Sequence, residues 1–553
     1  MPAGIIVSMT KPQKRALLLL IIFGGLYFIL FIPPNLTGAK DANMLALFEV
    51  DEYAQYSHAL GMLTPGETAY QTLRNFLIYL HYFYGYPFYF FSALVLFPIK
   101  LIFGAGWQTM TPVIMLVLRQ MINVMPMLVS VLLWVWMQTR FRSWWRALGL
   151  FVLLLSLPVV VVNNLWWHPD SLVFLFITLT VFFLQRDDLC FGRNFFLAAL
   201  ACGLATGTKH LGLFFVLTVP VYILWGVLSK RLRWGRAFGL GALFVLLMVL
   251  AVVVSNPLLL LPLERAEIIA VQKLQFQQTS VGILTANQQP FFASGYPEDI
   301  RIHYGEVFFL LLAFSSLVAG IVNPQRRLLN VLILTWMIPL TVVILNFGTR
   351  RTHYFLPVMI PFFSTFANSF EPFSSSVQNT ANRFGRWFPK VLMGLYAVLI
   401  LGQMFLFIRT DKEVYLRTLF REATSASIKF YEQVETNILA KMPEERITAY
   451  RDWHIYFPDA PSRRVEMNWN LATYDYIRDL KPNLILLERE NILMFARPEV
   501  VEEAVDPDRM EMVHEFYAAA GRGKLQGYRQ VYQSSFGLVF VDDNLFNTFF
   551  ASK

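Results

Sequence analysis

Long apolar runs, separated by short polar segments, recur along the first three quarters of the chain. A helix needs about 20 apolar residues to cross the hydrocarbon core of a membrane. Runs of this kind lie at 16–33, 113–138, 147–164, 171–186, 194–209, 211–229, 237–258, 305–323, 328–347, 353–370 and 391–408. The pattern therefore predicts a polytopic α-helical membrane protein with about 11 transmembrane helices.

One further apolar stretch, "YPFYFFSALVLFPIKLIFG" at 86–104, decides the topology. Cytoplasmic loops carry an excess of Lys and Arg, so the basic clusters should share one side of the membrane. They do so only if 86–104 does not cross, and we expect this stretch to lie along the outer membrane face, within a large first outer loop at 34–112. A twelfth span is the alternative. The clusters are Lys11/Lys14/Arg15, Arg140/Arg142/Arg146, Arg186/Arg193, Lys230/Arg231/Arg233/Arg236, Arg326/Arg327 and Arg383/Arg386/Lys390.

The composition changes after residue 409, where the chain becomes charged and alternates short apolar runs with helical patterns. "RITAYRDW", "NLILLE", "YRQVYQ" and "GLVFVDD" are typical of strands, and "LATYDYIRDL" is typical of a helix. We therefore divide the chain into a transmembrane domain at 1–409 and a small extracytoplasmic α/β domain at 410–553. With 11 crossings the N-terminus is cytoplasmic and the C-terminus periplasmic or lumenal, and we favour a bacterial inner membrane.

Composition agrees with this assignment and excludes other classes. The chain is 56% hydrophobic and 15% charged, which is too apolar for a soluble globular protein. Its net charge of +9 comes from clusters in the loops, so membrane topology explains it without a nucleic-acid partner.

Ionisable residues gather at the predicted outer ends of the spans. Such residues are costly near a bilayer and tend to mark function. Carboxylates supply general bases or metal ligands, while Lys, Arg and His bind phosphate. Together they suit an enzyme that takes a sugar from a polyprenyl phosphate, which needs a base for the acceptor hydroxyl and cations for the departing phosphate. The candidates are Asp51 and Glu52, His168 and Asp170 in "WWHPD", Lys209 and His210 in "TGTKH", and Arg350, Arg351, His353 and Tyr354 in "FGTRRTHYF".

The arrangement resembles the GT-C glycosyltransferases, in the branch of the dolichyl-phosphate-mannose protein mannosyltransferases and the bacterial lipid A aminoarabinose transferases. The resemblance covers about 15–410. The motifs that carry it are "DE" (51–52), "HYFYGYPFYFFSAL" (81–94), "HPDSLVFLF" (168–176), "GLATGTKHLGL" (203–213), "SNPLLLLP" (255–262) and "RRTHYFLPVMIP" (350–361).

The resemblance implies an inverting transferase in which Asp51 is the base that activates the acceptor. Glu52 would orient the acceptor or support Asp51, and Asp170 would hold the acceptor or a divalent cation, with no other cofactor implied. Adjacent side chains on an extended backbone face opposite ways, so one acid only should enter the pocket, and we favour Asp51. The implied partners are a polyprenyl-phosphate sugar donor, a glycan, lipid or protein acceptor, and membrane lipids.

Other interpretations of the same residues stay open at this point. Asp51 and Glu52 also fit solvated loop acids, His168 and Asp170 fit helix capping, and Lys209 fits snorkelling to the headgroups. Arg350, Arg351 and Tyr354 fit interface anchors. The alternative functions are a transporter or flippase of a lipid-linked saccharide, and an assembly protein that uses its tail as an interaction module.

Overall fold

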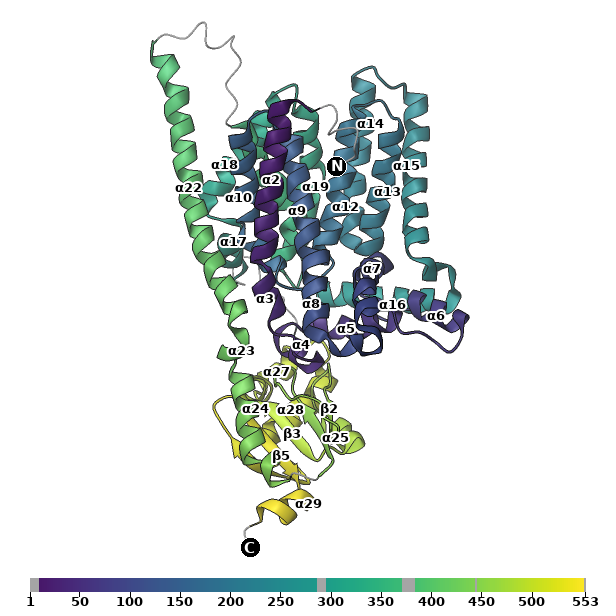
Figure 1. Cartoon of the computed structure of the whole chain (residues 1–553), viewed down its shortest axis with the longest axis vertical. Helices are drawn as coiled ribbons and strands as arrows, with labels where there is room; N and C mark the ends of the chain where they lie inside the picture. Colours follow the sequence, from purple (N-terminus) through teal and green to yellow (C-terminus); the bar gives the residue numbers. More distant parts are fainter. Residues whose placement is uncertain (1–8, 286–294, 370–382, 443–444, 552–553) are drawn as a thin grey trace.

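The computed structural model describes residues 9–285, 295–369, 383–442 and 445–551, and it places a small domain at one end of a long helical bundle (Figure 1). We call the end of the bundle next to this domain the domain-proximal end. The bundle consists of α2 (Lys11–Leu30), α8 (Thr111–Leu118), η2 (Arg119–Val124), α9 (Met125–Thr139), α10 (Trp144–Leu155), α11 (Pro158–Asn163), α12 (Asp170–Asp187), α13 (Arg193–Thr208), η3 (His210–Leu217), α14 (Thr218–Leu228), α15 (Trp234–Ser255), α18 (Val307–Val322), α19 (Arg327–Leu345), η6 (Thr352–Phe355), α20 (Leu356–Ser364), η7 (Thr365–Asn368) and α22 (Arg383–Leu419).

Each of the 11 predicted apolar runs falls on helices of this bundle. By length and apolar composition alone, 7 helices among the described residues are able to cross a membrane, or up to 8 if a bent pair counts as one span. The bent pair is α17 (Tyr296–Tyr304) with α18, at 63°. Several of the other runs form helices that are short or broken, such as α10 and α11, so the count of 11 stays a prediction.

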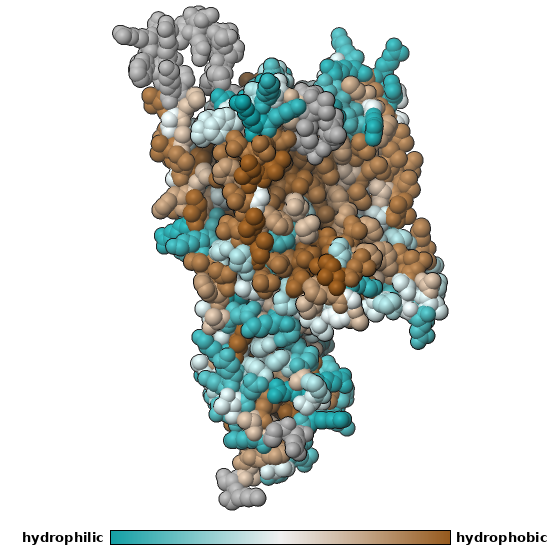
Figure 2. All heavy atoms as spheres, in the orientation of Figure 1, coloured by the Kyte–Doolittle hydropathy of each residue, from teal (hydrophilic) through white to brown (hydrophobic). Residues whose placement is uncertain are grey.

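The two ends of the bundle differ in polarity from its middle. Figure 2 shows a broad hydrophobic band between hydrophilic surfaces. At the end far from the small domain, basic loops meet: Gln13 Nε2 donates to the carbonyl of Arg140 at 2.9 Å, and Arg231 lies 3.6 Å from Asp188. The chain is a multi-pass membrane protein by its composition and by this band.

The segment between the first two long helices folds at the domain-proximal end. It contains α3 (Ile32–Leu36), α4 (Ala42–Phe48), α5 (Val50–Met62), α6 (Ala69–Leu77), α7 (Tyr86–Phe103) and η1 (Gly104–Thr109), and it is joined there by η4 (Pro257–Leu260), α16 (Pro262–Ser280) and α17. Its aromatic side chains, among them Tyr79 and Tyr89, form a separate core together with Trp167 from the segment before α12.

Helix α7, the expected surface segment, begins and ends at this same end of the bundle. Gly85 N–H donates to the carbonyl of Thr208 before the helix, and Tyr56 donates to Thr111 after it, at 2.9 and 3.1 Å. Although α7 with η1 is long and apolar enough to cross a membrane, in Figure 1 it lies with α5 and α16 and does not run along the bundle.

The C-terminal domain is the expected small α/β fold. Its five-stranded sheet has the order β2-β1-β3-β5-β4, with β1 parallel to both β2 and β3 and with β5 antiparallel to β3 and β4. The strands are β1 (Ile447–Arg451), β2 (Arg463–Glu466), β3 (Leu484–Glu488), β4 (Tyr528–Gln533) and β5 (Gly537–Asp542). The helices are α23 (Arg421–Thr424), α24 (Ala426–Asn437), η8 (Leu439–Lys441), α25 (Tyr474–Leu480), α26 (Arg489–Phe495), α27 (Glu499–Glu502), α28 (Pro507–Gly521), α29 (Asp543–Leu545) and η9 (Phe546–Phe550). Four of these strands were predicted, and β2 was not.

The domain is held against α4 by buried polar contacts. Asn43 donates to Asp459 at 2.9 Å and accepts from Arg451 at 3.0 Å, while Tyr456 donates to Asp41 at 2.7 Å. The side chain of Arg451 is fully buried in this junction. The contacts fix the domain next to the first turn of α5, where Asp51 lies.

Candidate active site

Asp51 and Glu52 occupy the first turn of α5, and they point in different directions. The expectation of an extended backbone was wrong, because both residues are helical and their side chains are about 100° apart around the axis. Asp51 is exposed, whereas Glu52 is fully buried. Of the two acids, Asp51 alone is open to a substrate.

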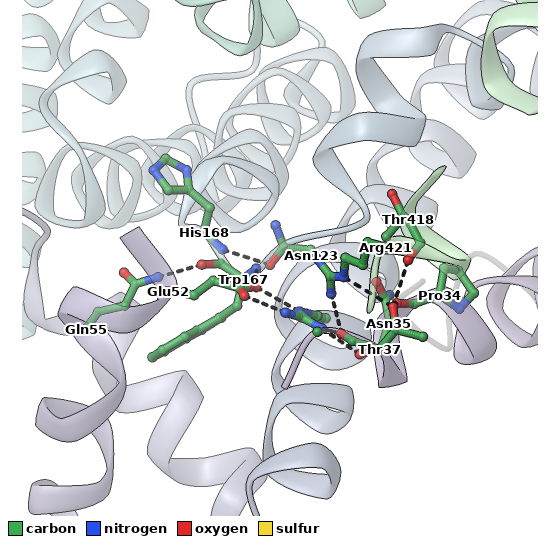
Figure 3. A network of polar contacts seen from close by, with 12 residues as sticks. Pro34, Asn35, Thr37, Glu52, Gln55, Asn123, Trp167, His168, Thr418 and Arg421 are labelled. Carbon is green, nitrogen blue, oxygen red and sulfur yellow. Dashed lines mark hydrogen bonds and ion pairs between the residues drawn. The ribbon is translucent and has the colours of Figure 1, made fainter. Parts of the chain in front are cut away.

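Glu52 forms a bidentate ion pair with Arg119, and neither side chain is exposed to solvent. The two Glu52 oxygens lie 2.8 and 2.5 Å from Nε and Nη2 of the guanidinium. Trp167 N–H also donates to Glu52 at 2.6 Å, and Arg119 donates to the carbonyls of Asn35 and Thr37. Figure 3 shows this network joining α5, the end of α3 and the "WWHPD" segment. Glu52 therefore holds these elements together, and its carboxylate is closed off from solvent.

A π-helical turn presents Arg119 to this network. The turn, η2, interrupts the helix formed by α8 and α9, and π turns inside helices are frequent at functional sites. Asn123 in the same turn accepts a hydrogen bond from His168 N–H at 3.2 Å. One distorted turn thus anchors both Glu52, through Arg119, and the segment that carries Asp170.

Asp170 begins α12 and is the centre of a buried ionisable cluster at the domain-proximal end. Its Oδ1 lies 2.6 Å from Lys209 Nζ, and its Oδ2 lies 2.5 Å from His168 Nδ1 and 3.7 Å from His353 Nε2. The side chains of Asp170 and Lys209 are 7% and 12% exposed. Trp166 stacks on His168 with ring centroids 4.2 Å apart. The cluster joins residues from three separate predicted motifs.

Two tyrosines flank the Lys209 ammonium group. Nζ lies 5.9 Å from the ring centroid of Tyr84 and 5.2 Å from that of Tyr354, within the range of cation–π contact. The hydroxyl of Tyr84 is 2.6 Å from His168 Nε2. Burial, and then the negative charges of Asp51 and Asp170, raise the pKa of Tyr84 well above its usual range. Both carboxylates therefore act electrostatically on the same phenol.

Two glycines bring the Tyr84 segment close to Lys209. A Cβ on Gly85 would lie 1.6 Å from the carbonyl oxygen of Gly207, so the backbones approach as closely as only glycine allows. Asn256, in the predicted "SNPLLLLP" motif, bridges them: it accepts from Tyr86 N–H at 2.8 Å and donates to the Gly207 carbonyl at 3.1 Å.

A cavity of about 120 Å³ opens beside this contact. Its walls come from the first-loop aromatics, the end of α13, η4 and α16, and they include Tyr79, Tyr82, Tyr84, Lys209, His210 and Gln272. Lys209 thus contacts both the ionisable cluster and an open volume.

The remaining predicted residues lie around the cluster without entering it. His210 is exposed and lines the cavity. Arg351 is exposed and Arg350 is half-buried, on the segment between α19 and η6 that leads to His353 and Tyr354.

Three residues of the ionisable cluster have side chains that could bind a metal ion. His168, Asp170 and His353 offer ligand atoms that all lie within 4.8 Å of one another, a geometry that would suit a divalent cation. Lys209, however, already neutralises Asp170 at 2.6 Å. A cation held by these three residues would compete with this ammonium group for the Asp170 carboxylate.

Two residues of the site, Arg119 and Tyr84, were not predicted from the sequence. Arg119 lies alone inside an apolar run, and an isolated charge in a span is by itself a functional signal. Tyr84 lies within the quoted aromatic segment, where nothing in the local pattern distinguishes it from its neighbours.

Comparison with known proteins supports the fold. No protein-family model and no curated protein matches the sequence. Among solved structures, the chain is similar to ArnT from Cupriavidus metallidurans bound to undecaprenyl phosphate, with 13% identity, 96% of this chain and 98% of that chain covered, and a TM-score of 0.51.

Two further structures are more distant. The apo state of the same ArnT gives 14% identity, 95% and 98% coverage and a TM-score of 0.49. The Archaeoglobus fulgidus oligosaccharyltransferase tethered with an acceptor peptide gives 12% identity, 83% and 65% coverage and a TM-score of 0.40. The likeness to the undecaprenyl-phosphate-bound ArnT extends over both domains, and it shows that the chain shares the fold of that structure.

Proposed function

We propose that the protein is an inverting glycosyltransferase that moves a sugar from a polyprenyl-phosphate donor to an acceptor on the outer, periplasmic face of a bacterial inner membrane. The ArnT structure that shares the fold was solved with undecaprenyl phosphate, which suggests the donor class. The position of the site at the domain-proximal end of the bundle agrees with a donor whose phosphate lies at headgroup depth.

The observation that carries the proposal is the setting of Lys209. This ammonium group is 12% exposed, contacts Asp170 and lies near two tyrosine rings at the end of α13. A buried cation needs a counter-charge, and a phosphate arriving from the lipid headgroups would share it with Asp170. An exposed carboxylate, Asp51, acts electrostatically on Tyr84, one of these two tyrosines.

The proposed reaction is a single displacement at the anomeric carbon of the donor sugar. Asp51 accepts the proton of the acceptor hydroxyl as the acceptor oxygen forms a bond to the anomeric carbon. The bond from that carbon to the phosphate oxygen breaks on the opposite face, which inverts the configuration. The electron pair leaves with the polyprenyl phosphate, whose charge is stabilised by Lys209 and by hydrogen bonds from the tyrosine and histidine side chains around it.

The distribution of polar groups favours a transferase over a transporter. Transporters bind near the middle of the membrane, between broken helices. Here the ionisable cluster and the cavity lie at one end of the bundle, together with the first-loop segment.

Donor turnover tests the proposal. Purified protein in nanodiscs would be given radiolabelled polyprenyl-phosphate sugars, and the release of polyprenyl phosphate would be measured with and without candidate acceptors. We expect Asp51→Asn to lower the rate by at least about 100-fold, the usual contribution of a general base. Glu67→Gln removes another exposed acid of the first outer segment and serves as the matched control. Full turnover in Asp51→Asn would exclude this residue as the base. If no donor were used with any acceptor while labelled lipid-linked sugar crossed the bilayer, the transporter would replace the transferase.

A further inference from the structure

The three parallel strands of the C-terminal sheet direct their carboxyl ends toward the catalytic helix. Arg451 at the end of β1 contacts Asn43, and Trp469, just after β2, lies against Tyr53 of α5 with ring centroids 6.0 Å apart. The chain passes from β1 to β2 on one side and to β3 on the other, so β1 and β3 form a topological switch point. In open α/β sheets, ligands bind at the carboxyl edge beside such a point.

Hydrogen-bonding groups meet at this edge. Asp452, after β1, is fully buried, and it accepts from Tyr517 at 2.6 Å and from Glu488 N–H at 2.8 Å. The Glu488 side chain ends β3, and its Oε2 lies 3.3 Å from Nδ1 of His454, whose side chain is half exposed. The Nε–H of the buried Arg451 has no hydrogen-bond acceptor among the described residues. Among these groups, the half-exposed imidazole of His454 reaches solvent, and the buried Glu488 carboxylate contacts it from below the surface.

An aromatic surface lies beside these groups. Trp469 is 42% exposed, and its ring is 6.4 Å from that of Trp453, whose indole N–H donates to the carbonyl of Asn468 at 2.7 Å. With Tyr53, the two rings form a cluster contributed by both domains. Flat aromatic faces with hydrogen-bonding groups around them suit a sugar ring, which presents C–H groups on its faces and hydroxyls on its rim.

We propose that this edge is an acceptor subsite for a carbohydrate, with Trp469 stacking on a sugar ring and His454, which Glu488 holds in place, hydrogen-bonding to its hydroxyls. This inference rests on the proposed transferase function and names its acceptor class. The rigid contacts of Asn43 and Tyr456 keep the subsite at a fixed distance from α5.

The geometry also sets a minimum length for the acceptor. Tyr53 follows Asp51 by two residues, so the two side chains leave α5 on nearly opposite sides, about 200° apart. A helix with its side chains is about 10 Å wide, which exceeds one sugar ring. An acceptor that reaches from Asp51 to Trp469 around the first turn of α5 therefore needs at least two linked sugars.

The test compares acceptors of different lengths in the full-length protein. The probes are the methyl monosaccharide, disaccharide and tetrasaccharide of the manno, gluco, cello and chito series, each with the donor that the enzyme turns over. We expect Trp469→Ala to raise KM for the di- and tetrasaccharide of the preferred series about tenfold, as expected for loss of an aromatic contact. It should leave kcat unchanged, and Trp469→Phe should restore most of the affinity. Met512→Ala, at a side chain of the same domain with 44% exposure, is the control.

Binding measured without turnover separates this proposal from the proposed function. The anisotropy of fluorescein-labelled tetrasaccharides would be followed on the wild-type protein and on the Trp469→Ala and Glu488→Gln variants. We expect the wild-type protein to bind the tetrasaccharide of one series, and both variants to lose that binding. Asp51→Asn should bind the same tetrasaccharide normally and fail in catalysis. No binding of any series, an unchanged KM in Trp469→Ala, or an equal KM change for a peptide acceptor would overturn the subsite. Saccharide binding by a protein that uses no donor would leave the subsite standing and remove the transferase.

Discussion

The first turn of α5 gives two adjacent acids different tasks. Glu52 is buried with Arg119, and Asp51 is exposed. Removing one member of a buried ion pair leaves the other charge without compensation, whereas an exposed side chain contributes little to stability. Neighbouring substitutions should therefore separate stability from catalysis.

We expect Glu52→Gln to destabilise the protein by about 3–5 kcal/mol, because it leaves the Arg119 guanidinium buried without its counter-charge. Asp51→Asn should change stability by less than about 0.5 kcal/mol while it abolishes transfer. Thermal unfolding in detergent, followed with a thiol-reactive or intrinsic fluorescence probe, measures the difference. The double variant Glu52→Gln/Arg119→Met removes both charges and should recover part of the loss. A Glu52→Gln protein as stable as the wild type would contradict this assignment.

The His454–Glu488 pair predicts a pH dependence in the C-terminal domain. The hydrogen bond and the charge of Glu488 raise the pKa of His454 above its usual value. Since the folded state holds this proton more tightly than the unfolded state, the stabilising contribution is complete below about pH 6.5 and is lost as pH rises through the raised pKa. Burial also raises the pKa of Asp452 to about 6, so its ionisation between about pH 4 and pH 6 lowers stability as well.

Modification by diethylpyrocarbonate, which attacks neutral imidazole, reports this pKa at a single residue. The midpoint of His454 modification should lie above that of a free histidine in the wild type, and Glu488→Gln should move it to lower pH. His514, which contacts the carbonyl of Phe495, provides an internal control that should not move. An unchanged His454 midpoint in Glu488→Gln would show that the pair does not govern this proton.

At the level of elements, the contact between Gly85 and Gly207 positions the first-loop segment on α13. A Cβ at position 85 would lie 1.6 Å from the Gly207 carbonyl oxygen, so Gly85→Ala must push Tyr84 away from Lys209 and His168. We expect this variant to be inserted in the membrane and to lose most donor turnover. Gly61→Ala, where a Cβ meets nothing within 4 Å, should retain full activity. Equal activities of the two variants would show that the close approach is not required.

The elements were predictable where a local pattern defines them. The apolar runs correspond to helices, and alternating segments such as "NLILLE" correspond to strands, because each pattern reflects the surroundings of one element. The edge strand β2 was missed since "RRVE" has three charged residues in four and too short an alternation to stand out. The helical form of α5 was missed for a similar reason, because its polar residues are also typical of a loop.

The candidate site was predictable in part. Asp170, Lys209 and His353 were each identified from their own motifs, and the structure brings them together. The pairing of Glu52 with Arg119 joins residues 67 positions apart, and no local signal specifies it. Contacts of this kind depend on how whole helices pack, so they become visible only in the folded chain.

For the whole molecule, the placement of the first-loop segment and the C-terminal domain at the same end of the bundle predicts that they lie on the same side of the membrane. Seven of the predicted apolar runs follow Cys190, beginning at 194, 211, 237, 305, 328, 353 and 391. An odd number of crossings places Cys190 and the C-terminal domain on opposite sides of the membrane. Three runs separate Thr68 from Cys190, so Thr68 shares the side of the C-terminal domain unless 86–104 crosses as well.

Labelling with a membrane-impermeant maleimide tests this arrangement. Cys190 is exposed and Cys202 is buried, so the native chain offers one reactive thiol, and Cys190→Ser provides the background for Thr68→Cys and Ser535→Cys. In cells with a permeable outer membrane, both introduced thiols should react, and native Cys190 should react only after the inner membrane is disrupted. Labelling of Ser535→Cys but not Thr68→Cys would show that α7 crosses, contrary to the contacts that begin and end it at the same end of the bundle. Labelling of Cys190 in intact cells, with both introduced thiols protected, would invert the whole topology and move the Asp170 cluster to the cytoplasmic face.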